Sequence, residues 1–190
     1  MNRPFLKSGC AAIALLATAC TGVLIEDAPG LDSRASYYRG EFDYATRNGA
    51  IMTTIVGNPF AAPKPGFDAR VVGLMKEQNR GVPAEFVAAH GARTDPVFSV
   101  VVAFNMAPGI SPNRLCREPA TVQTAPHSRD LRMSAAFCHG DALQSDAAGV
   151  AYQLAGPDDP KFAELVRGVT NAMVPIDTSE EGDGGDSVMP

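Results

Sequence analysis

Residues 97–104 set the strongest limit on how this chain folds. They read Val-Phe-Ser-Val-Val-Val-Ala-Phe, an almost continuous apolar run that follows Asp95-Pro96. A strand with one buried face alternates apolar and polar side chains, whereas a strand buried on both faces carries a nearly continuous apolar run. The segment therefore predicts a central strand that is covered on both faces.

Three further segments predict strands. Residues 50–56 are rich in β-branched side chains and lie between turn-forming glycines, a composition typical of strands. Residues 129–138 alternate between large apolar side chains and small or polar ones, which predicts a strand with one face more deeply buried. A last strand is expected around Val150 and Tyr152.

Two segments predict helices. Residues 67–79 carry apolar side chains at the spacing of one helix face. Asp158, Asp159 and Pro160 supply an acidic N-cap and a proline in the first turn of a second helix. Residues 83–90 are compatible with either a short helix or an irregular turn.

The order of these elements predicts the fold class. A strand, one or two helices, three strands and a helix indicate a single α+β domain over residues 37–176. We expect an antiparallel or mixed sheet of about four strands, with two or three helices packed on one face. Residues 177–190 combine five acidic residues with glycines and contain no Lys or Arg, so they predict a disordered acidic tail.

The first 19 residues have the layout of a secretory signal peptide. Arg3 and Lys7 precede a short apolar stretch over residues 9–18, and Ala17-Thr18-Ala19 follows. A cationic start, an apolar centre and small residues before the cleavage site are the three parts of such a signal. We therefore exclude residues 1–19 from the fold.

The sequence Leu16-Ala17-Thr18-Ala19-Cys20 resembles a bacterial lipobox, although its Leu lies one position further from the Cys than usual. The resemblance predicts lipid attachment at Cys20, through a diacylglyceryl thioether and an N-acyl chain. Residues 20–36 would then form a tether. The alternatives are ordinary cleavage after Ala19 and an uncleaved anchor.

Three phrases in the body resemble a group of uncharacterised small bacterial envelope lipoproteins. The resemblance covers roughly residues 46–175 and rests on Gly57-Asn58-Pro59-Phe60, Ala136-Phe137-Cys138-x-Gly140-Asp141 and Asp159-Pro160-x-Phe162. Together with the lipobox, it implies a location in the bacterial cell envelope, lipid-anchored and facing the periplasm. It implies neither an activity nor site residues, and it leaves the inner and outer membranes open.

The two body cysteines predict a disulfide. Cys116 and Cys138 are 22 positions apart, and an exported chain matures where disulfides persist. A buried free thiol, a metal ligand and a nucleophile are the alternative roles. His139 is a poor catalytic partner for Cys138, because adjacent residues of a strand point to opposite faces.

Composition and motifs narrow the function further. Without the leader and the tail, the net charge of −5 reduces to about −2, so no basic surface for nucleic acid is expected. The sequence contains no G-x-S-x-G, H-E-x-x-H or P-loop motif, and we assign no catalytic residue, metal ligand or cofactor.

We therefore expect a small binding or structural domain, with an envelope protein or a lipid as its partner. The alternative is a soluble periplasmic enzyme or small-molecule-binding protein. A ligand-binding domain predicts an apolar pocket between sheet and helices, whereas an interaction domain predicts an exposed apolar patch.

Overall fold

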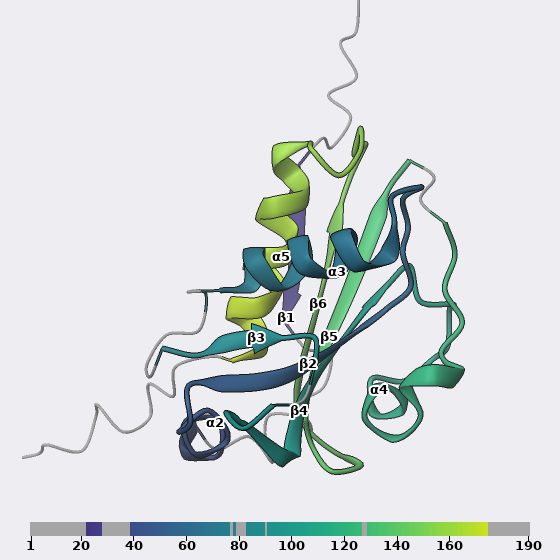
Figure 1. Ribbon diagram of the computed structural model, residues 1–190. Helices are drawn as coiled ribbons and strands as arrows, with labels where there is room; N and C mark the ends of the chain where they lie inside the picture. The colour runs from purple at the N-terminus through teal and green to yellow at the C-terminus, as the bar shows by residue number, and fades with distance from the viewer. Residues whose placement is uncertain are drawn as a thin grey trace, which may run out of the picture.

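The computed structural model describes residues 22–27, 39–76, 78, 83–89, 91–126 and 129–174. The predicted signal peptide, the predicted lipid attachment at Cys20 and the predicted acidic tail lie outside these residues. Within them the chain forms a mixed sheet with helices on both faces (Figure 1).

The sheet has six strands in the order β1-β6-β5-β4-β2-β3. The strands are β1 (Val23–Asp27), β2 (Ala50–Val56), β3 (Glu85–Val87), β4 (Thr94–Phe104), β5 (Leu131–His139) and β6 (Ala142–Ala151). The helices are α2 (Arg39–Ala45), α3 (Lys64–Met75), α4 (Asn113–Arg117) and α5 (Pro160–Met173), with a 3-10 turn at Pro119–Thr121. β2 pairs in parallel with β3 and β4, and the other pairs are antiparallel.

β4 is the central strand that the apolar run predicts. Val100, Val102 and Phe104 enter the larger core on one face, whereas Val101 and Ala103 enter a smaller core on the other. All five side chains are buried. A run without polar alternation is the expected sequence of such a strand, because neither face meets water.

The larger core lies under α2, α3 and α5. Phe67 of α3 and Phe104 of β4 meet with their ring centroids 5.2 Å apart, and Phe162 of α5 lies 6.0 Å from each of them. Each buried aromatic or aliphatic side chain of this kind contributes roughly 1.5–3 kcal/mol. The predicted apolar face of α5 is confirmed, and the Asp159 side chain caps the helix by accepting a hydrogen bond from the Lys161 N–H at 3.0 Å.

The smaller core lies under α4, on the opposite face of the sheet (Figure 1). Three helices, α2, α3 and α5, pack on one face as expected, but a fourth helix, α4, covers the opposite face, where no helix was expected. Leu115 and Cys116 of α4 are buried against the sheet, and a disulfide joins Cys116 to Cys138 of β5 with Cα atoms 5.5 Å apart. The five-residue helix is too short to show a helical period, so its sequence gave no indication of a second layer.

The sheet is also larger than the expected four strands. Residues 85–87 form the edge strand β3, where a short helix or a turn was expected. β1 lies inside the segment expected to be a tether, and it pairs with β6 from Val23↔Ala151 to Asp27↔Ala147. Its partner is more than a hundred positions away in the sequence, so no local pattern could reveal the pairing.

Two glycines explain why β1 docks so closely. Ile25 of β1 packs over Gly149 of β6 and Gly168 of α5. A Cβ atom at Gly168 would lie only 2.6 Å from Cδ1 of Ile25, and one at Gly149 would lie 3.0 Å from it. The missing side chains therefore make the notch that receives β1.

Candidate functional site

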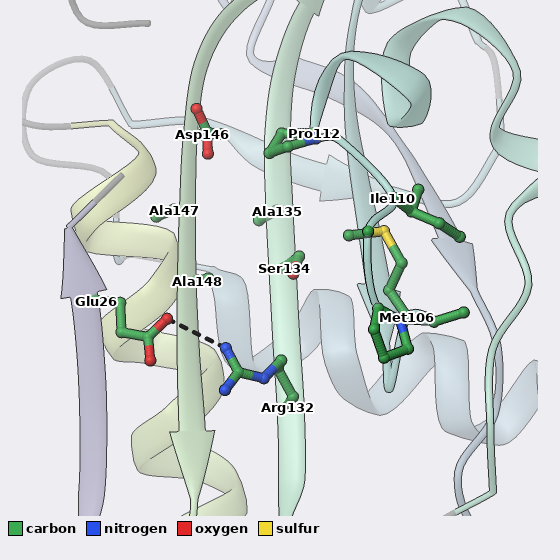
Figure 2. A pocket seen from close by; sticks show the side chains of 13 residues that line it. Glu26, Met106, Ile110, Pro112, Arg132, Ser134, Ala135, Asp146, Ala147 and Ala148 are labelled. Carbon is green, nitrogen blue, oxygen red and sulfur yellow. Dashed lines mark hydrogen bonds and ion pairs between the residues drawn. The ribbon is translucent and has the colours of Figure 1, made fainter. Parts of the chain in front are cut away.

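The α4 side of the sheet carries a groove of about 400 Å³ between the loop of residues 106–112 and strands β5 and β6. Met106, Ile110 and Pro112 form its loop wall, and small side chains of the two strands form its floor (Figure 2). Its volume lies within the range of roughly 300–1,000 Å³ found for small-molecule sites. The sequence led us to expect an apolar pocket between sheet and helices, whereas here a loop supplies the second wall.

Strand register brings the polar groups of the groove together. Ala148 pairs with Glu26 of β1 and with Ser134 of β5, so these side chains form one row across three strands. Arg132 and Asp146 lie two residues from this row on their own strands, and a spacing of two keeps a side chain on the same face. The period of the strands therefore collects two carboxylates, a guanidinium and a hydroxyl on one face.

The charges lie at the two ends of the groove. Nη1 of Arg132 and Oε2 of Glu26 form an ion pair of 3.1 Å at one end, and Asp146 lies at the other end beside Pro112 (Figure 2). Both partners of the ion pair are partly exposed, so the pair adds at most about 1 kcal/mol to folding. Asp146 and Ser134 are each only 7% exposed. The groove thus combines an apolar loop wall with charged side chains at both ends and the Ser134 hydroxyl between them.

Backbone contacts hold the loop wall in place. Asn105 adopts a positive φ of 48°, a conformation that Asn tolerates better than most residues. Its N–H donates to the Arg132 carbonyl at 2.8 Å, and its side-chain oxygen accepts from the Arg132 N–H at 3.0 Å. The Ala107 N–H donates to the Gln123 carbonyl at 3.0 Å. The Asn105 contacts tie one end of the wall to the strand that carries Arg132 and Ser134, and the Ala107 contact ties it to the segment after the 3-10 turn.

The two predicted disulfide cysteines meet, and they lie outside the groove. Cys138 is fully buried, and its disulfide excludes the free-thiol, metal-ligand and nucleophile alternatives in the structure. His139 points to the opposite face of β5, where its ring stacks on Phe98 with a centroid distance of 4.4 Å. No cluster of three or more His, Cys, Asp or Glu that could hold a metal ion occurs among the described residues.

The resemblance phrases have structural roles. Asn58 closes a turn by accepting from the Phe60 N–H at 3.1 Å and donating to the Ala62 carbonyl at 2.7 Å. Phe137 is fully buried in the larger core, and Phe60 packs against that core. None of these three residues lines the groove.

Sequence reasoning missed the groove residues for different reasons. Alternation along residues 129–138 predicts that Arg132 and Ser134 share a face, but it does not show what lies opposite. Asp146 lies on a strand whose expected centre was further along the chain. Glu26 lies in the expected tether. One signal could have identified the groove residues: polar residues recur on the strand faces that carry the smaller side chains.

A second hollow, of about 690 Å³, lies between α3 and β3. Its charged lining residues are Lys64 and Asp68, which form an ion pair of 2.8 Å. Lys64 also donates to the Ile55 carbonyl at 2.9 Å. The groove on the α4 side is more enclosed than this hollow and gathers polar side chains from three strands beside an apolar loop wall, so it is the stronger candidate.

No helix within the described part of the chain is long and apolar enough to cross a membrane. Comparisons of the chain with protein-family models, curated proteins and solved structures gave no match.

Proposed function

We propose that this protein is a lipid-anchored binding protein of the bacterial cell envelope, and that its groove holds a small amphipathic molecule. The groove of about 400 Å³ is the observation that carries the binding proposal. The anchor is proposed from the lipobox-like sequence that ends at Cys20. Both parts are open to direct measurement.

The free energy that apolar contact can supply indicates what kind of ligand the groove can hold. Four methylenes buried against Met106, Ile110 and the alanines of the floor would contribute about 3 kcal/mol, at roughly 0.8 kcal/mol each. A millimolar complex already needs about 4 kcal/mol. Apolar contact of only four methylenes is therefore too weak, so a ligand that short also needs polar groups that meet the polar ends of the groove, whereas a larger aromatic probe buries more apolar surface.

Filling the groove tests the binding proposal. The probe is the neutral fluorophore N-phenyl-1-naphthylamine, titrated into the folded protein. Ala148 lies in the groove floor, so Ala148→Phe should weaken saturable binding at least about tenfold while the unfolding temperature stays close to that of the wild type. Ala142→Phe makes the same change at an exposed position of the same strand, and it should bind like the wild type. Equal affinity in both variants would refute the groove as the site.

Intact mass tests the anchor. The native protein should have the mass of triacylated Cys20 to Pro190, and Cys20→Ala should lose its membrane association. An unmodified chain in the soluble periplasm would instead support the alternative of a diffusible binding protein or enzyme.

A further inference from the structure

The described sheet begins almost at the proposed lipid attachment site. β1 starts at Val23, three positions after Cys20. Even before the strand starts, the Gly22 carbonyl accepts a hydrogen bond from the Tyr152 N–H at 3.1 Å. Three extended residues span at most about 11 Å. A lipid on Cys20 would therefore lie within about 11 Å of the start of β1.

The strand pairing defines which end of the molecule this is. Val23 and Leu131 both pair with Ala151, so β1 and β5 begin where β6 ends. We call this the anchor end, and it also holds the loop from Tyr152 to Asp159. The β5–β6 turn at Gly140-Asp141 lies at the opposite end, about 30 Å away along the ten residues of β6 at roughly 3.3 Å each.

The chain leaves the fold at that opposite end. α5 runs back along the sheet, and the carbonyl of Met173 near its end accepts a hydrogen bond from Oγ of Ser145 at 2.6 Å. Ser145 lies near the start of β6. The last described residues therefore lie at the end of the sheet that is remote from Val23.

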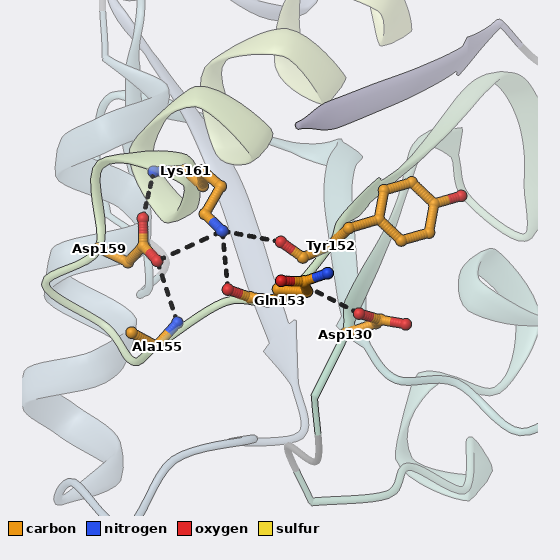
Figure 3. A network of polar contacts seen from close by, with 6 residues as sticks. All are labelled: Asp130, Tyr152, Gln153, Ala155, Asp159 and Lys161. Carbon is orange, nitrogen blue, oxygen red and sulfur yellow. Dashed lines mark hydrogen bonds and ion pairs between the residues drawn. The ribbon is translucent and has the colours of Figure 1, made fainter. Parts of the chain in front are cut away.

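A polar network makes the anchor end a fixed surface (Figure 3). Nζ of Lys161 donates to the carbonyls of Tyr152 and Gln153 at 2.8 and 2.7 Å, and it lies 3.7 Å from Oδ2 of Asp159. The Gln153 N–H donates to Oδ1 of Asp130 at 2.9 Å. The Lys161 ammonium thus serves to hold the loop together, and its side chain is only 22% exposed.

Tyr152 adds an aromatic side chain to this surface. Its ring points away from the network (Figure 3) and is half-buried. Tyrosine suits the boundary between lipid and water, because its ring is apolar and its hydroxyl is polar. The residue therefore suits contact with phospholipid headgroups beside the chain that leads to Cys20.

We propose that the domain docks directly on the phospholipid surface of its membrane through the anchor end, with no flexible tether between them. The proposal rests on the lipid anchor of the proposed function. It fixes an orientation: Tyr152 and its loop face the headgroups, and the turn at Gly140-Asp141 lies about 30 Å further out.

Depth-dependent quenching tests the orientation. The lipidated protein is reconstituted into vesicles of phosphatidylethanolamine and phosphatidylglycerol that carry a headgroup nitroxide. A maleimide fluorophore is placed on Ala155→Cys at the anchor end, or on Asp141→Cys at the remote end. Both positions are exposed, and neither lipidated Cys20 nor the disulfide cysteines react with maleimide. We expect several-fold stronger quenching at position 155 than at position 141.

An insertion supplies the matched control. About ten Gly and Ser residues placed between Thr21 and Gly22 form a flexible spacer with a root-mean-square length of about 18 Å. This spacer should lower the quenching at position 155 to the level at position 141. Equal quenching at the two positions without the spacer, on protein whose mass shows three acyl chains, overturns the orientation alone. A mass without acyl chains overturns the anchor and the orientation together.

Discussion

Gly168 and Ile25 form a contact in which an added methyl group has opposite effects in two backgrounds. In the wild type, Gly168→Ala should destabilise the protein by about 1–2 kcal/mol, because the new Cβ atom meets Ile25. In an Ile25→Ala background the space is open, and the better helix propensity of Ala should instead stabilise it by about 0.5–1 kcal/mol. Urea unfolding of the wild type, the two single variants and the double variant measures the four free energies of unfolding. The same sign in both backgrounds would show that Ile25 does not occupy this notch.

The Asp95 carboxyl makes the stability of the folded protein depend on pH. The Val97 N–H at 2.9 Å and then the Arg47 guanidinium at 2.8 Å lower the pKa of this buried carboxyl below its ordinary 3.8. A lowered folded-state pKa stabilises the protein above the unfolded-state pKa, and this stability is lost as the pH falls through the folded-state pKa.

Asp95→Asn should therefore be less stable than the wild type near pH 6, because it loses the ion pair with Arg47. The difference should shrink as the pH falls below about 4. Urea unfolding at both pH values provides the comparison. A constant difference across this range would contradict the assigned role of the carboxylate.

The disulfide fastens α4 to the face of the sheet that holds the groove. The chain-entropy relation gives about 3 kcal/mol for a closed loop of this length, and the cysteines are 22 positions apart. Cys116→Ala combined with Cys138→Ala should lose about that free energy of unfolding. Reduction of the wild type should reproduce the loss. Unfolding curves that do not change on reduction would mean that the bridge does not contribute.

The sequence predicts those helices and strands whose own burial leaves a long apolar pattern in their residues. β4 is identified by a run of eight residues of which seven are apolar, and α5 by its cap and apolar face, since both patterns reflect the element's own burial. β1 and β3 are short edge strands, and their existence depends on pairing with β6 and β2. The groove needs β1, β5, β6 and a loop at once. Its residues could therefore be placed on a strand face but not assembled into a site.

The groove is built from three strands and a loop. The charge of Arg132 should therefore affect which ligands bind more than it affects the free energy of unfolding. Arg132→Met removes a partly exposed ion pair and should change the free energy of unfolding by no more than about 1 kcal/mol. It should weaken binding of anionic 1-anilinonaphthalene-8-sulfonate several-fold more than binding of neutral N-phenyl-1-naphthylamine. Arg129→Met, outside the groove lining, is the control and should leave both titrations unchanged. Equal weakening of both probes by Arg132→Met would argue against charge selection by Arg132.

The pairing of β1 with β6 also fixes the order in which the molecule can assemble. β1 is the first described strand of the chain, yet it pairs with β6 and packs on α5, the last strand and the last helix. Contacts so distant in sequence slow folding, because a long loop has to close first. During synthesis, Val23–Asp27 therefore emerges early and stays unpaired until β6 has followed. The sheet can be completed only after Ala151 has emerged, and the cover of β1 by α5 only after Met173.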